Sequence, residues 1–162
     1  MRLTEFFSRL RRRVARRPDR LLTTPVCLVD AQGADWDTAS IGRFGEDVAG
    51  RWLRREAGCR VLFRNFRPRD GGELDLVVRD GETLVFVEVK TRTSIDFGRP
   101  ALAVDATKQA LIIRGARGWL SLLGWPAILF RFDVIEVVLR EGAPPSVTWV
   151  RSAFNLPDHL RW

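Results

Sequence analysis

The chain has 162 residues, a length that suits one domain with enough buried core to fold alone and argues against a two-domain enzyme or a repeat array. Its two cysteines, Cys27 and Cys59, are too few for a disulfide framework, and a single histidine argues against a Cys/His zinc cluster. No run approaches the roughly 18 apolar residues of a membrane span, so we expect a cytoplasmic protein without a membrane-spanning segment.

The formal net charge of +7 is unevenly distributed along the chain. Residues 1–20 contain eight arginines against Glu5 and Asp19, a net charge of +6, whereas the remaining residues hold 19 basic and 18 acidic groups, a net charge of +1. The basicity therefore belongs to an N-terminal arm. This arm binds nucleic acid, an anionic membrane surface or a partner, or it results from a start codon assigned too far upstream; the sequence leaves these alternatives open.

The chain divides into three predicted parts. Residues 1–39 form a basic N-terminal extension and linker, in which residues 1–17 have the apolar spacing of a short amphipathic helix ended by Pro18. Residues 40–155 form the folded domain, and residues 156–162 form a C-terminal tail.

The folded domain begins with a helix that Ser40 caps and that continues to about Glu56. Strands, a second helix and two further strands follow, in the order α-β-β-β-α-β-β, which predicts an α/β fold with helices packed against a mixed sheet. The later elements are predicted over residues 61–66, 72–79, 82–92, 105–123, 130–139 and 146–150.

The second and third strands are predicted to form a hairpin. Treating Asp80-Gly81 as a two-residue turn pairs Arg79 with Glu82. A loop with an odd number of residues would instead place the side chains of one strand on the opposite face. Because side chains alternate along a strand, this pairing places four charged residues on one face of the sheet: Glu73, Asp75, Glu88 and Lys90.

In this register Glu73 lies directly opposite Glu88, and Asp75 is its diagonal neighbour. Like charges at such positions repel, so a divalent cation, Mg²⁺ or Mn²⁺, is the natural counter-charge. Lys90 then lies beside the cation, where it can position or help to deprotonate a water for phosphodiester hydrolysis. The alternative is an exposed charged face on which Lys90 merely pairs with Glu88.

Glu46 lies at the margin of the apolar stripe of the first helix, so it can point toward the sheet as a further metal ligand. The face that also carries Val77, Leu84 and Phe86 offers this helix a place to pack. The alternative is an ordinary first-turn glutamate that interacts with the helix dipole.

Six short motifs follow one another in the folded domain: Gly42-Arg-Phe-Gly-Glu46, Arg64-Asn-Phe-Arg67, Gly72-Glu-Leu-Asp-Leu76, Val87-Glu-Val-Lys-Thr-Arg92, Phe97-Gly-Arg-Pro100 and Arg131-Phe-Asp-Val-Ile-Glu-Val137. In this order they resemble the bacterial YraN-like family, an uncharacterised family with a restriction-endonuclease-like (PD-(D/E)xK) core.

The resemblance implies a three-layer αβα core related to Holliday-junction resolvases and RecB-type nucleases. It implies that Asp75 and Glu88 bind the metal, that Lys90 is the catalytic lysine and that Glu46 is the acid on the helix. Glu73 falls inside a matched motif and is a further candidate ligand. No proline precedes Asp75, and the family brings no established reaction, so the resemblance supports the fold and the site more than an activity.

Basic groups around an acidic centre suit a polyanion that is cut at a metal. The candidate nucleic-acid contacts are Arg64, Arg67, Arg92, Arg99 and Lys108, of which Lys108 is one of only two lysines in the chain. The six tryptophans fall mostly on predicted packing stripes, which favours core positions over base stacking.

The leading hypothesis is therefore a Mg²⁺- or Mn²⁺-dependent nuclease that acts on DNA, including branched or processed DNA. A non-catalytic nucleic-acid-binding protein that keeps the fold is the rival, and an RNA-directed nuclease is a third alternative. Resolvase-like relatives often work as dimers, so a homodimer is a further expectation.

Overall fold

One mixed five-stranded sheet organises the computed structural model, which describes residues 19–93 and 104–157. The strands lie in the order β1-β2-β3-β4-β5; only β3 and β4 are parallel, and the other neighbours are antiparallel. The strands span Arg60–Phe66 (β1), Leu74–Asp80 (β2), Thr83–Arg92 (β3), Phe130–Val138 (β4) and Ser146–Phe154 (β5). The predicted order of elements and the predicted α/β class are confirmed.

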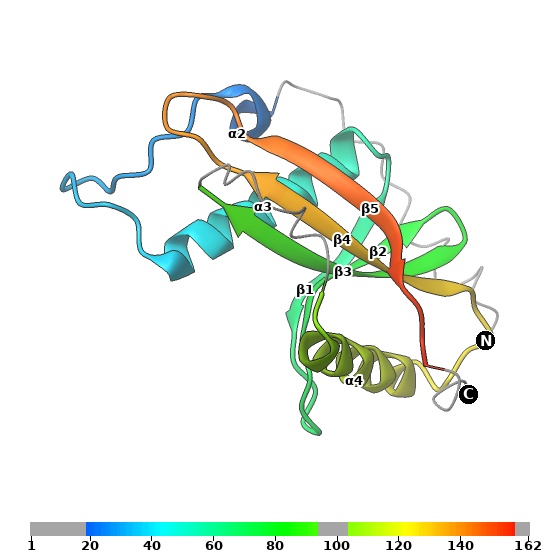
Figure 1. The fold of residues 1–162 in the computed structure, drawn as a ribbon. Coiled ribbons are helices and arrows are strands. Elements are labelled where there is room, and N and C mark those ends of the chain that lie inside the picture. Colours follow the sequence, from blue (N-terminus) through cyan, green and yellow to red (C-terminus); the bar gives the residue numbers. More distant parts are fainter. Residues whose placement is uncertain (1–18, 94–103, 158–162) are drawn as a thin grey trace.

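Two helices cover opposite faces of the sheet and complete a three-layer αβα arrangement (Figure 1). Helix α3 (Thr38–Arg55) packs on the face that carries Val78, Val85 and Val87. Helix α4 (Ala106–Leu122) connects the parallel strands β3 and β4 and packs on the face of Phe86. Because both faces of the central parts of β2 and β3 are buried, residues 76–78 and 84–87 form continuous apolar runs.

The prediction that the first helix packs beside Val77, Leu84 and Phe86 was therefore wrong. These three residues are buried under α4 instead. Both faces contain buried apolar residues, so the sequence pattern shows that two covered faces exist but cannot assign a helix to each.

Asp residues begin both long helices. Asp37, not Ser40 as predicted, is the N-cap of α3, because its side chain accepts a 2.7 Å hydrogen bond from Ser40 N. Asp105 caps α4 in the same way by accepting a 2.8 Å bond from Lys108 N. Each cap satisfies one of the amide groups that the first turn of a helix leaves without a partner.

The turn of the β2–β3 hairpin lies one residue further along the chain than predicted. Asp80 pairs with Thr83, so Gly81-Glu82 forms the turn and Arg79 faces Leu84 instead of Glu82. Gly81 adopts a φ of +58°, and the carboxylate of Asp80 accepts a 2.8 Å bond from Arg131 Nη2 within the sheet. The register changes by two positions, which leaves every side chain on its predicted face.

Strand β5 continues to Phe154, whereas the prediction ended it at Val150. The carboxylate of Asp133, which is fully buried in β4, accepts 2.9 Å bonds from Ser152 N and from the indole N–H of Trp149. Arg131 Nε donates to the same carboxylate at 3.0 Å. This buried group satisfies the backbone where the β4–β5 register shifts, so the strand continues beyond the irregularity.

The chain before α3 also contacts the core. Helix α2 (Arg20–Thr23) is followed by Val26, which forms a bridge with Glu141 and is buried. The predicted helix of residues 1–17 lies outside the described residues. Of the two cysteines, Cys27 is exposed and Cys59 is buried, and burial raises the pKa of the Cys59 thiol to about 11.

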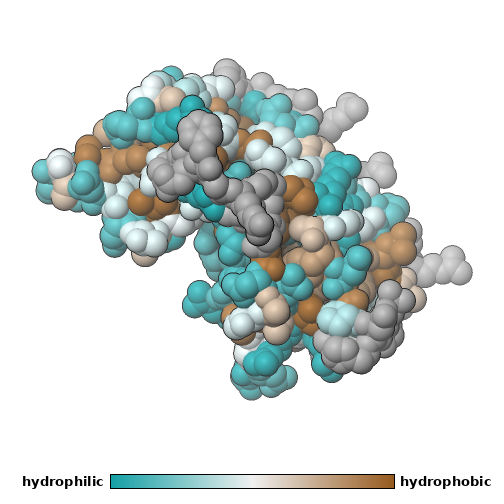
Figure 2. All heavy atoms as spheres, viewed as in Figure 1, coloured by the Kyte–Doolittle hydropathy of each residue, from teal (hydrophilic) through white to brown (hydrophobic). Residues whose placement is uncertain are grey.

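The surface mixes hydrophilic and hydrophobic side chains (Figure 2). The most exposed large hydrophobic side chains of the described residues are Leu122 and Leu129, which flank the connection between α4 and β4, and Trp125 within that connection is half exposed. Among the described residues no helix is both long and apolar enough to cross a membrane.

Candidate functional site

Two acidic side chains meet where β2 and β3 run side by side. Leu76 pairs with Val87, and continuing this antiparallel register by one residue brings Asp75 directly opposite Glu88. Cβ atoms at such positions are about 4.5–5.5 Å apart. The prediction placed Asp75 diagonal to Glu88, so the corrected register brings this pair closer together than expected.

The Asp75 carboxyl group is held in a largely buried position. Its Oδ2 accepts a 2.8 Å hydrogen bond from Val89 N on the neighbouring strand. Burial, and then the charge of Glu88, raise the pKa of Asp75 to about 7; the Val89 bond and the charge of Lys108 lower it in part. Asp75 is therefore poised to lose a proton near neutral pH, or to lose it when a cation approaches.

Glu88 is 3% exposed and is one of two buried charged side chains among the described residues. Its Oε1 lies 3.1 Å from Lys90 Nζ, and its Oε2 lies 3.3 Å from Lys108 Nζ. The geometry at Oε2 does not make a hydrogen bond, which leaves this buried oxygen without a hydrogen-bond donor in the described part of the chain. A buried carboxylate oxygen in this condition is costly and is open to a further ligand.

Lys108 joins Glu73 to this cluster from the first turn of α4. Its ammonium group forms an ion pair and a hydrogen bond with Glu73 Oε1 in addition to its contact with Glu88. Burial alone would lower the pKa of Lys108, but the Glu73 bond and the charges of Glu88 and Asp75 outweigh it and raise that pKa. The hydrogen bond from Lys108 in turn lowers the pKa of Glu73.

A close backbone contact positions Glu73 against α4. A Cβ atom on Gly72 would lie 2.5 Å from Gly115 N and 2.7 Å from Leu111 O, and Gly72 has a φ of +94°. Glu73 N donates a 3.3 Å bond to the same Leu111 carbonyl. Only glycine allows the β1–β2 loop to approach the helix this closely, so the packing of backbone on backbone places Glu73 within reach of Lys108.

Glu46 approaches the cluster from α3, on the other face of the sheet. Its side chain is half-buried, and its charge is one of the contributions that raise the pKa of Asp75. The adjacent Gly45 is packed so closely on the Thr91 side chain that a Cβ there would overlap it. Contact between α3 and the end of β3 thus brings Glu46 near the acidic pair.

The arginines predicted to contact nucleic acid have different surroundings in the structure. Arg64 pairs with Asp47 at 2.8 Å and donates to the Glu46 carbonyl at 3.5 Å. Arg92 pairs at 3.3 Å with Glu136, which lies beside Lys90 in the sheet. Arg67 lies beside the cluster, 3.6 Å from Glu73, and is 75% exposed at its side chain. Arg99 lies outside the described residues.

The sequence predicts Lys108 as a phosphate contact, whereas the structure places it in the acidic cluster. The only signal was its rarity, because Lys90 and Lys108 are the only lysines beside 25 arginines. Its contacts depend on the fold of the β1–β2 loop, which no local pattern encodes.

The oxygen donors available to a cation are therefore Asp75 and Glu88, with Glu73 and Glu46 nearby. Among the described residues, no group of three or more His, Cys, Asp or Glu side chains is arranged to hold a metal ion. The side chains alone thus do not form a complete metal cage in this part of the chain.

Comparisons with known proteins place this arrangement in a family. A UPF0102 protein of Solibacter usitatus is 49% identical over 116 residues, covering 70% of this chain and 84% of its own length. A UPF0102 protein of Geobacter sulfurreducens is 45% identical over 116 residues, covering 72% and 89%. One from Beutenbergia cavernae is 54% identical over 105 residues, covering 64% and 87%.

The family described as "Uncharacterised protein family UPF0102" matches residues 45–137, a range that contains Glu46, the β2–β3 hairpin and Lys108. This match confirms the YraN-like resemblance seen in the motifs. The chain therefore belongs to the uncharacterised protein family UPF0102.

Proposed function

We propose that this protein is a divalent-cation-dependent nuclease that hydrolyses phosphodiester bonds in DNA. The observation that carries the proposal is the pair of Asp75 and the buried Glu88 on adjacent strands, with Lys90 Nζ 3.1 Å from Glu88. Two carboxylates and one lysine on adjacent interior strands of a mixed sheet suit metal-assisted phosphodiester hydrolysis, which needs ligands for the ion and a group that positions a water.

The donor chemistry fits Mg²⁺ or Mn²⁺. Mg²⁺ is usually bound through one or two carboxylates together with waters and substrate phosphates, so a complete protein cage is not needed. Asp75 and Glu88 would hold the ion, and Glu88 Oε2 is a buried oxygen without a hydrogen-bond donor among the described residues. When bound, the ion would polarise the phosphate and lower the pKa of a bound water.

The protein's own residues have separate roles in this proposal. Asp75, with a pKa of about 7, would be held as the carboxylate by a bound cation. Lys90, which is one-third exposed, can orient the attacking water on the solvent side of Glu88. Glu46 and Glu73 add negative charge around the pair and strengthen its attraction for a divalent ion.

A second candidate function is a nucleic-acid-binding protein that keeps the fold without catalysis. The contacts of Lys108 with Glu73 and Glu88 favour it, because this ammonium already supplies part of the counter-charge that a metal would provide. In that case Asp75, with a pKa of about 7, stays partly protonated at neutral pH and the cluster has only a structural role.

Cleavage assays separate these functions. Purified protein is incubated with linear, nicked, flapped and four-way DNA and with RNA, with Mg²⁺, with Mn²⁺ or with EDTA. We expect metal-dependent cleavage of DNA that Asp75→Asn and Lys90→Ala each abolish, whereas Glu82→Gln at the exposed hairpin turn leaves it unchanged. Cleavage that survives both substitutions would overturn this site, and binding without cleavage of any substrate would favour the second function.

A further inference from the structure

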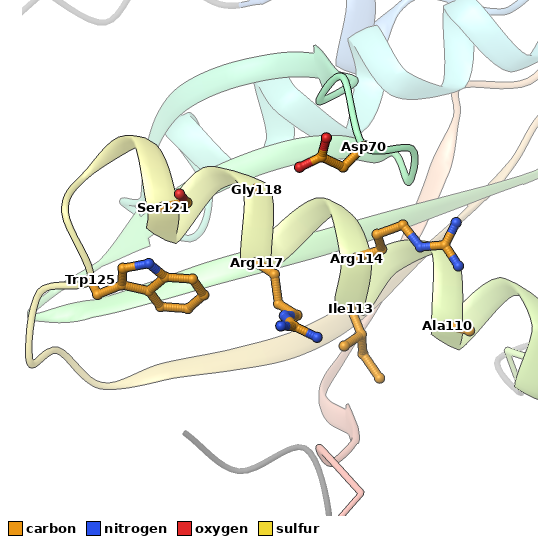
Figure 3. Close-up of a pocket in the computed structure, with 8 residues that line it drawn as sticks. All are labelled: Asp70, Ala110, Ile113, Arg114, Arg117, Gly118, Ser121 and Trp125. Carbon is orange, nitrogen blue, oxygen red and sulfur yellow. The ribbon is translucent and has the colours of Figure 1, made fainter.

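A groove of about 470 Å³ lies on the solvent side of α4, apart from the acidic cluster (Figure 3). Its volume lies within the range of pockets that hold small organic groups. Arg114, Arg117 and Ser121 line it from the helix, Trp125 from the following turn and Asp70 from the β1–β2 loop. The five side chains are exposed.

We propose that this groove binds one nucleotide of a single-stranded nucleic acid, with the base against Trp125 and the phosphate at Arg114 and Arg117. An indole ring stacks on any base, and guanidinium groups bind phosphate through paired N–H donors. Asp70 and Ser121 at the rim offer an acceptor and a donor to the base edge.

Charge complementarity favours a polyanion over an apolar protein segment as the occupant. Over its whole length, from Ala106 to Leu122, α4 contains three basic side chains and no acidic one. The adjoining β1–β2 loop adds two exposed basic residues, Arg67 and Arg69, of which Arg67 lies 3.6 Å from Glu73.

The turn that presents Trp125 has an unusual backbone. Trp125 has a φ of +54°, a conformation that bulky residues rarely adopt, and it precedes Pro126. Its N–H donates a 2.9 Å bond to Leu120 O, which ties the turn to the end of α4. Figure 3 shows the indole of Trp125 and the side chain of Arg117 on the same side of the helix. The ring is thus held on the side of α4 that carries Arg117, where base and phosphate of one nucleotide can be bound together.

The walls of the groove are also fixed relative to each other. A Cβ on Gly118 would lie 2.6 Å from Pro68, and the guanidinium of Arg114 lies against Gly71. The loop that carries Asp70 is therefore packed on the helix that carries the arginines, so little ordering is needed when a ligand binds.

The groove deepens the proposed nuclease function, because the same loop carries Asp70 to the groove and Glu73 to the acidic cluster. Along the axis of α4, Arg114 and Arg117 lie roughly 9 and 14 Å from Lys108. A stacked strand covers this separation in about three to four nucleotides at its ~3.4 Å spacing. If the groove binds one nucleotide of the substrate, the substrate is single-stranded near the point of cleavage.

The test measures binding alone, in EDTA, so that it does not depend on catalysis. Fluorescence anisotropy follows the binding of labelled oligothymidylate and oligouridylate to the full chain over a range of salt concentrations. We expect Trp125→Ala to weaken binding about 5- to 100-fold and Trp125→Phe to retain most of it. Tighter binding of one oligonucleotide identifies the groove's ligand as DNA or RNA.

Matched variants isolate the groove from general charge. Arg114→Gln and Arg117→Gln should each reduce the slope of log affinity against log salt by about 0.7, whereas Arg140→Gln, at an exposed position elsewhere, should not. Leu129→Ala controls for the loss of an exposed apolar side chain. Equal affinities for the wild type, Trp125→Ala and the arginine variants, or no binding of either oligonucleotide, would overturn the groove proposal. Cleavage in the separate metal assay would still stand in that case.

Discussion

The ammonium nitrogen of Lys108 lies 3.3 Å from Oε2 of Glu88 and links the first turn of α4 to the most buried acid of the cluster. This contact joins residues from the two sides of the β3–α4 connection. It makes Lys108 the internal counter-ion of a group that would otherwise be a poorly compensated buried charge.

Replacing Lys108 by methionine removes this counter-ion while keeping much of the side-chain volume. We expect the free energy of unfolding to fall by about 1–3 kcal/mol, less than for a fully unpaired charge because Lys90 stays near Glu88. Urea unfolding at neutral pH measures the change, with Arg140→Met as the exposed control. An unchanged midpoint for Lys108→Met would show that the ion pair contributes no stability.

The raised pKa of Asp75 should make the stability of the protein depend on pH. This pKa is raised from 3.8 to about 7 in the folded protein, so between these values the folded state binds more protons than the unfolded state. The contribution of Asp75 to stability therefore falls as pH rises through this window and is lowest above pH 7.

Asp75→Asn should remove this dependence and stabilise the metal-free protein at pH 8 by up to about 4 kcal/mol. Urea unfolding over a pH series compares the variant with the wild type and with Asp35→Asn at an exposed position. Parallel pH profiles for wild type and Asp75→Asn would contradict the raised pKa.

Substitution of Gly72 should disturb the geometry of the acidic cluster. Gly72→Ala places a methyl group 2.5 Å from Gly115 N at a φ of +94°, so the β1–β2 loop must move away from α4. We expect a loss of about 3 kcal/mol or more in unfolding free energy, together with weaker nuclease activity because Glu73 moves with the loop. The matched control is Gly142→Ala, which also has a positive φ but no atom within 4 Å of the new Cβ and should cost only about 1–2 kcal/mol. Equal losses would show that the close approach is not the cause.

Substitution of Asp133, which lies outside the acidic cluster, should lower the free energy of unfolding. Asp133→Asn replaces one acceptor oxygen by an amide group that faces Arg131, Trp149 and Ser152, all of which donate to the present carboxylate. We expect a loss of about 2–4 kcal/mol in thermal or urea unfolding, against less than about 1 kcal/mol for Glu82→Gln at the exposed turn. A loss no greater than that of Glu82→Gln would assign the network no structural role.

The face of the acidic pair was predictable from the sequence because strand side chains alternate. Moving the hairpin turn from Asp80-Gly81 to Gly81-Glu82 changed which residues are opposite each other but left Asp75, Glu88 and Lys90 on one face. The turn itself was misplaced because Asp80 is held in the strand by Arg131, a partner 51 residues away. Glycine signals a turn without fixing its register.

The partners of the cluster were not predictable in the same way. Lys108 reaches Glu73 because Gly72 packs on Gly115, a contact between segments separated by more than 40 residues. Likewise, α4 rather than α3 covers Phe86, which follows from the crossover between parallel strands and not from any difference in hydrophobicity. Both depend on tertiary packing that a local pattern does not contain.

The contrasting environments of the two cysteines have a practical consequence. The Cys59 thiol is buried with a pKa of about 11, so almost none of it is thiolate at neutral pH, whereas Cys27 is exposed. A maleimide dye should therefore attach to the native chain at Cys27 alone. The wild-type sequence thus provides a single attachment point for fluorescence or spin-label measurements, without any engineered cysteine.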